Sequence, residues 1–112
     1  MKIEQREEQG VMIVEPAGRL DSNTAPMLDQ VLESMDASEN GTHLIVDFSS
    51  VEYISSAGLR VILKAVKDRQ GQAKSFAASG MQEHVREIFE ISGFDSFVEI
   101  YPDFHKALAS FS

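Results

Sequence analysis

The stretch Leu44–Val66, LIVDFSSVEYISSAGLRVILKAV, decides the fold of this chain. It opens on a nearly continuous apolar run ending at Phe48, which is typical of a strand covered on both faces. A polar break and the small residues Ser55-Ser56-Ala57-Gly58 follow. The apolar positions then recur at helical spacing: Leu59, Ile62, Leu63 and Val66. This pattern predicts a buried strand, a short loop and a helix that begins at serine.

The residues before this stretch predict a hairpin and a helix. The hairpin is expected over residues 3–18, with its turn at Gln9-Gly10. Pro16 cannot donate to a ladder, so we expect it at the end of the second strand or on an open edge. An apolar stripe then predicts a helix that reaches Asp36, with Pro26 in its first turn. Residues 38–41 are expected to end this helix.

The residues after the stretch predict two further strands and two further helices. Lys74–Ala78 is the first strand, and the helix after it opens at Ser79-Gly80 with an apolar stripe that begins at Met81. Gly93 is expected to cap that helix in the left-handed conformation. Phe97–Ile100 is a last short strand. Asp103 then caps a short closing helix whose apolar residues are Phe104, Leu108 and Phe111.

The expected order is strand, strand, helix, strand, helix, strand, helix, strand, helix. Alternation of this kind requires parallel strands joined by right-handed crossovers, with helices packed on the sheet. We therefore expect one α/β domain over residues 1–112. It should contain a mixed, mostly parallel sheet of about five strands, with about four helices packed on it.

Composition restricts the partners that this chain can have. Eighteen acidic and ten basic side chains give a formal net charge of −8, which argues against nucleic acid and against an anionic membrane surface. There is no cysteine, and the three histidines, His43, His84 and His105, lack the spacing of metal ligands. No apolar run is long enough to span a bilayer. We expect a cytoplasmic protein with no cofactor, no metal and no membrane insertion.

The predicted topology points to two loops as the binding region. In open α/β sheets, binding sites collect at the carboxyl ends of parallel strands, beside the helices that follow. The loop 19–24 contains Asp21 and the loop 49–58 contains Ser56. A serine before a helix is usually an N-cap, and Ser55 is placed to serve as that cap equally well. The functional alternative is that Ser56 accepts a phosphoryl group, adding about −1.5 to −2 charges beside the helix N-terminus.

Three segments together resemble a known family. Residues 47–63, DFSSVEYISSAGLRVIL, look like the signature of the STAS domain, and in particular of the anti-sigma factor antagonists. Gly18-Arg19-Leu20-Asp21 followed by Asn23-Thr24-Ala25 resembles the first block of that family. Residues 89–94 together with 98–101 resemble its last block. The resemblance covers nearly the whole chain in the right order.

This resemblance implies a partner switch. An anti-sigma factor that is itself a serine kinase phosphorylates the antagonist, the unphosphorylated antagonist binds that kinase and frees the sigma factor, and a PP2C-type phosphatase resets the system. The acceptor of the family lies two residues before the glycine of the motif, which is Ser56 before Gly58. Asp21 and Ser55 then lie around the acceptor. The expected partner-binding residues are Ser56, Arg60, Val61 and Lys64.

One departure from the family pattern concerns Ser55. Many phosphorylated members carry aspartate immediately before the acceptor, which leaves open whether Ser55 is modified instead. A second hypothesis is therefore an unmodified adaptor of the same fold, as in the STAS subunits of some lipid-transporting ABC complexes.

A catalytic function is the weakest alternative. The G-x-S-x-G elbow of hydrolases and the phosphate-binding G-x-x-x-x-G-K-[ST] loop are both absent, so we expect no enzymatic activity. Asp21 and Asp47 are acid–base candidates only by residue type, because no general-base partner is evident. A helix cap and a strand-end residue are the simpler interpretations of the two.

Overall fold

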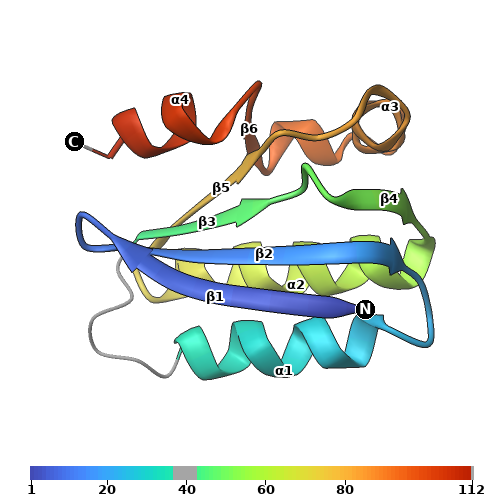
Figure 1. Ribbon diagram of the computed structural model, residues 1–112, viewed down its shortest axis with the longest axis horizontal. Coiled ribbons are helices and arrows are strands. Elements are labelled where there is room, and N and C mark those ends of the chain that lie inside the picture. The colour runs from blue at the N-terminus through green and yellow to red at the C-terminus, as the bar shows by residue number, and fades with distance from the viewer. Residues whose placement is uncertain (37–42, 112) are drawn as a thin grey trace.

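The computed structural model describes residues 1–36 and 43–111, so the expected helix end at residues 38–41 lies outside the described residues. The elements follow in the order β1 (Lys2–Glu8), β2 (Val11–Leu20), α1 (Ala25–Asp36), β3 (His43–Asp47), β4 (Val51–Ile54), α2 (Ser56–Gly71), β5 (Ser75–Ser79), α3 (Glu83–Ile91), the 3₁₀ helix η1 (Phe94–Ser96), β6 (Glu99–Tyr101) and α4 (Phe104–Ala109) (Figure 1). The predicted α/β architecture is confirmed. Among the described residues, no helix is both long and apolar enough to cross a bilayer.

One mixed sheet organises the domain. Its order is β1-β2-β3-β5-β6, and β4 pairs with β2 beyond the end of β3. Among the described strands, only the β1–β2 pair is antiparallel. Its turn lies at Gln9 (φ 53°) and Gly10 (φ 79°), the position that the sequence predicts. The remaining pairs are parallel because each is joined by a crossover through a helix or through the rest of the sheet.

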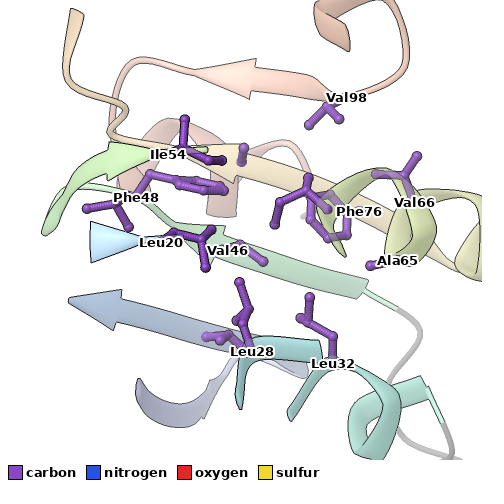
Figure 2. Close-up of a cluster of buried hydrophobic side chains, with 14 of the residues drawn as sticks. Leu20, Leu28, Leu32, Val46, Phe48, Ile54, Ala65, Val66, Phe76 and Val98 are labelled. Atoms are coloured by element: carbon purple, nitrogen blue, oxygen red, sulfur yellow. The ribbon is translucent and has the colours of Figure 1, made fainter. Parts of the chain in front are cut away.

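The helices cover both faces of the sheet. In Figure 1, α1 and α2 lie side by side along one face and α4 lies on the other. Figure 2 shows Leu28 and Leu32 of α1 pointing toward Leu20 and Val46 of the strands, and all four side chains are buried. On the opposite face, Ala107 of α4 belongs to a smaller apolar cluster on β2, β3 and β5.

The strand β4 was not predicted. Residues 51–54 were expected in the loop 49–58; in the strand, an exposed pair separates two buried apolar residues, so no apolar run marks it. Arg19 and Leu20, expected in the first loop, belong to the end of β2, and Gly18–Leu20 pair with β4. Gly18 has a φ of 110°, and the register shifts between Gly18 and Arg19, so β2 bends there to meet its second partner.

The expected position of Pro16 was wrong. It lies inside β2 and is buried, at neither a strand end nor an open edge. On the side away from β1, the pairing of β2 with β3 ends at Val14 and the pairing with β4 begins at Gly18. Pro16 falls in the interval between the two partners, where a strand tolerates a residue that cannot donate.

Several other boundaries differ by a few residues. The helix α3 begins at Glu83, because Ser79 ends β5 and Gly80 has a φ of 70°. The last strand begins at Glu99, and Leu63 of α2 is only half-buried. The predicted caps are confirmed: Gly93 is left-handed at φ 75°, and Asp103 accepts the amide hydrogen of Lys106 at 2.8 Å.

Candidate functional site

The pairing of β2 with β4 brings the two predicted loops together. Leu20, the last residue of β2, lies opposite Ile54, the last residue of β4. The amide of Ser55 donates to the carbonyl oxygen of Leu20 at 2.9 Å. The turn that starts at Asp21 and the start of α2 therefore emerge at the same edge of the sheet, as the resemblance implied.

The two serines at the start of α2 have different roles. Ser55 is the N-cap: its backbone is extended, and its Oγ accepts the amide hydrogen of Gly58 at 3.4 Å. Ser56 is the first helical residue and is exposed. Within the described part of the chain, no hydrogen bond involves the Ser56 hydroxyl. The structure thus resolves the open question of which serine caps the helix, and it leaves the Ser56 hydroxyl facing solvent.

Gly58 allows α2 to approach the strands closely. A Cβ atom at this position would lie 2.7 Å from Leu20 Cγ and 2.9 Å from Ile54 Cγ1. Contacts below 3 Å of this kind do not occur between relaxed side chains, so the close approach requires glycine. Because Gly58 fixes the first turn of α2 against β2 and β4, it also fixes the position of Ser56.

Asp21 organises the turn before α1. Its Oδ1 accepts hydrogen bonds from the amides of Asn23 (3.0 Å) and Thr24 (3.2 Å) and lies 3.3 Å from Thr24 Oγ1. These bonds, the one from Asn23 first, lower the pKa of the Asp21 carboxyl, and the Arg19 guanidinium 4.0 Å away adds to the effect. The interpretation of Asp21 as a local cap is confirmed. Its role beside the acceptor stays a prediction.

The two predicted partner-binding cations of α2, Arg60 and Lys64, have different surroundings. Arg60 is exposed and makes no ion pair with another described residue, whereas Val61 is half-buried. Lys64 Nζ lies 3.1 Å from Asp29 Oδ1 and 2.5 Å from Glu33 Oε1, both on α1. These two carboxylates raise the pKa of Lys64 well above its usual range. Lys64 is therefore part of a bridge between α1 and α2.

Sequence reasoning missed Asp29 and Glu33. A signal was available, because carboxylates four residues apart lie on one face of a helix. The sequence did not reveal that α1 turns this face toward α2, where both side chains meet Lys64.

The other candidate residues contact different parts of the fold. Asp47 is buried at the end of β3, where its Oδ1 accepts the amide hydrogen of Ser49 at 2.9 Å, as expected of a strand-end residue. The histidines contact three different places: His43 contacts Ser75 and Phe111, His84 contacts the Glu52 carbonyl oxygen, and His105 contacts Phe104.

A cleft of about 690 Å³ lies between α3, η1 and β6. Its lining includes Arg86, Glu90 and Tyr101 but none of the predicted site residues. Ser56 is exposed at the start of α2 and lies outside this cleft. Such a surface suits contact with a macromolecule better than enclosure of a small molecule.

Comparison with known proteins supports the same family. BtrV of Bordetella bronchiseptica is 33% identical over 112 residues, covering 99% of this chain and 95% of BtrV. The anti-sigma-F factor antagonist RsfB of Mycobacterium tuberculosis is 30% identical, covering 88% of this chain and 80% of RsfB. The crystal structure of an anti-sigma factor antagonist from Mycobacterium paratuberculosis superposes with a TM-score of 0.88 at 26% identity, covering 97% of this chain and 92% of that one. The STAS domain family matches residues 2–107, and the chain belongs to this family.

Proposed function

We propose that this chain, as one STAS domain over residues 1–112, is an anti-sigma factor antagonist controlled by phosphorylation of Ser56. In the unphosphorylated form it binds an anti-sigma factor through the surface around Ser56, and this binding frees the sigma factor. The named function of RsfB supports the class of partner. The proposed setting is the bacterial cytoplasm, and the chain acts there as a substrate of other enzymes rather than as an enzyme.

The division of roles between Ser55 and Ser56 is the observation that carries this proposal. Because Ser55 supplies the N-cap, α2 does not need the hydroxyl of Ser56. Ser56 is exposed, so a kinase can reach it without opening the fold. The same division favours Ser56 over Ser55 as the acceptor, because Ser55 is half-buried and its Oγ is engaged by the Gly58 amide, whereas Ser56 is exposed.

The phosphorylated state should keep the fold and change only the surface. The kinase transfers the γ-phosphoryl group of ATP to Ser56 Oγ, the hydroxyl proton is released and ADP leaves. The product carries about −1.5 to −2 charges at neutral pH, next to the free amides and positive dipole end of α2. A PP2C-type phosphatase restores the hydroxyl by hydrolysis. The added charge therefore stays compatible with the domain that carries it.

For the bound anti-sigma factor, the added phosphate charge should be unfavourable. A like-charge contact in an interface costs several kcal/mol, and each 1.4 kcal/mol corresponds to about a tenfold change in affinity. The free guanidinium of Arg60 and the half-buried Val61 lie on the turn that follows Ser56 and form the remainder of the proposed contact. Lys64 contributes together with Asp29 and Glu33, as a bridged group whose net charge is −1.

Phosphorylation is tested with the cognate kinase and ATP, followed by mapping of the adduct by mass spectrometry. We expect one phosphate on Ser56 in the wild type and in Ser55→Ala, and none in Ser56→Ala. A phosphate on Ser55, or no phosphate from a kinase that is active on another substrate, contradicts the proposed acceptor.

The switch itself is tested by titration calorimetry with the anti-sigma factor. Ser56→Asp should weaken binding at least tenfold while its melting temperature stays close to that of the wild type. Unchanged binding would instead favour the unmodified adaptor of a transport complex. Lys67→Gln, on the exposed side of α2 three turns away, changes the net charge by the same −1 and controls for it.

A further inference from the structure

The strand β1 is the open edge of the sheet. It pairs antiparallel with β2 along its whole length, from Lys2 opposite Ala17 to Glu8 opposite Val11. Within the described residues it has no strand on its other side (Figure 1). Six of its seven residues are exposed. Its outer backbone groups are therefore available to another extended strand.

One face of β1 carries a row of alternating charges. Successive side chains of a strand point to opposite faces, so Lys2, Glu4, Arg6 and Glu8 share one face. Two ion pairs within the strand confirm this arrangement: Lys2 to Glu4 at 3.5 Å and Arg6 to Glu8 at 3.9 Å. The signs follow the order plus, minus, plus, minus. When two copies of this row lie antiparallel, each charge of one copy can therefore face an opposite charge of the other.

We propose that β1 pairs antiparallel with β1 of a second copy of this chain, with Gln5 of one copy opposite Gln5 of the other. This register places Lys2 opposite Glu8 and Glu4 opposite Arg6. The twofold axis repeats each contact, giving four opposite-charge pairs across the new strand pair. The two six-stranded sheets become one continuous sheet, without any change of fold in either copy.

The charge row selects this register over its neighbours. A slip of two residues in one direction places Glu4 opposite Glu4 and Lys2 opposite Arg6. A slip of two in the other direction places Arg6 opposite Arg6 and Glu4 opposite Glu8. A slip of one residue places Lys2 opposite Glu7 in one direction and Glu4 opposite Glu7 in the other. Each alternative therefore has fewer opposite-charge pairs than the four of the proposed register.

The same charges should protect the edge from unrelated strands. Charged side chains on an edge strand protect against non-specific pairing, because a foreign strand rarely matches them. The seven residues of β1 carry two basic and three acidic side chains, so each copy offers both cations and anions to the other.

Sedimentation equilibrium on the full chain tests this pairing. A single strand pair is a small interface, so the measurement should run from about 10 µM to about 1 mM at low salt. We expect the mean mass to rise toward the dimer as the concentration increases. A mass that stays monomeric across this range would overturn the proposal.

Charge reversals test the register. In Glu4→Lys the new lysine lies opposite Arg6, and in Arg6→Glu the new glutamate lies opposite Glu4. Each variant alone should lose self-association. An equimolar mixture of the two should regain it, because each new side chain then faces an opposite charge in the other variant. Failure of the mixture to associate, or association of Glu4→Lys as strong as the wild type, would contradict this register.

Two controls separate pairing from other effects. Glu87→Lys makes the same charge change at an exposed position of α3 and should associate as the wild type does. Arg6 also contacts Glu15 and the ring of Phe104 within the chain, so the melting temperature of Arg6→Glu is measured first. If that variant is unfolded, the outer pair is reversed instead: Lys2→Glu and Glu8→Lys change exposed residues whose ion pairs are with neighbours on β1. Each alone should lose self-association and their equimolar mixture should regain it, and a mixture that stays monomeric would sink the proposal.

Discussion

Gly58 lies against Leu20 so closely that a methyl group on Gly58 would be 2.7 Å from Leu20 Cγ. This contact joins the start of α2 to the end of β2, and it keeps the two loops of the proposed site close together. Because the contact leaves no space for a side chain, we expect substitution of Gly58 to disturb the proposed site.

Gly58→Ala should destabilise the domain by about 1–3 kcal/mol, because the added methyl overpacks a buried contact. The gain in helix propensity from glycine to alanine is about 1 kcal/mol and does not offset this cost. Thermal unfolding followed by circular dichroism measures the difference. Gly71→Ala is the matched control on the same helix: its Cβ meets no atom within 4 Å, and it should leave stability unchanged or slightly raised.

The roles of the two serines predict opposite sensitivities. Ser55→Ala removes the N-cap acceptor of α2 and should cost about 1 kcal/mol, at the low end of the usual range because the bond is 3.4 Å long. Ser56→Ala removes an exposed hydroxyl and should be neutral within about 0.5 kcal/mol. Urea denaturation of the two variants gives both values. Equal losses would mean that Ser56 also supports the helix, contrary to the proposed free hydroxyl.

The ionised Asp21 carboxyl should contribute to the free energy of unfolding, and this contribution should be lost in acid. Hydrogen bonds from Asn23 and Thr24 hold the pKa of Asp21 below the ordinary value of 3.8. The contribution is therefore fully present above pH 3.8 and is lost as the pH falls through the lower folded-state pKa. Melting temperatures of the wild type and Asp21→Asn between pH 7 and pH 2 test this.

The stability difference between the two proteins should be constant near neutral pH and shrink in acid. Asp68→Asn, on an exposed side of α2, is the charge-matched control. A difference for Asp21→Asn that is the same at every pH would show that the carboxylate charge does not contribute.

Ser79, at the end of β5, is fully buried, and its hydroxyl has no hydrogen-bond partner among the described residues. An unsatisfied buried polar group costs about 1–3 kcal/mol. Ser79→Ala should therefore raise the free energy of unfolding by about 1 kcal/mol. The reverse change two residues earlier on the same face of β5, Ala77→Ser, should lower the free energy of unfolding, since Ala77 is equally buried. A loss of stability in Ser79→Ala would reveal a partner for the hydroxyl.

The elements with strong local patterns were predicted well. The apolar run of β3 and the 3.6-residue period of α2 are properties of contiguous residues, so they were visible without tertiary information. The cap at Asp103 and the left-handed Gly93 follow from local backbone chemistry in the same way. The strand β4 was missed because its four residues carry little periodicity and are held by pairing with Gly18–Leu20, far away in the sequence.

The candidate site was predicted in its position and incompletely in its chemistry. The sequence placed Ser56 at the start of a helix and Asp21 in the loop 19–24, and the structure brings their loops together through the bond between Ser55 and Leu20. The sequence did not indicate that Lys64, expected as a partner contact, is bridged to Asp29 and Glu33. That bridge depends on the packing of α1 beside α2, which no local pattern specifies.

The sequence by itself determined the strand β3, the helix α2, the α/β class and the serine pair at the helix start. Each of these depends on residues a few positions apart, where steric and hydrogen-bonding preferences act without the rest of the chain. Only the tertiary structure decided which serine caps α2, which strand β4 joins and which strand, β1, is left at the sheet edge. Those outcomes depend on contacts between segments distant in the sequence. Such contacts stabilise the chain only once the sheet has assembled.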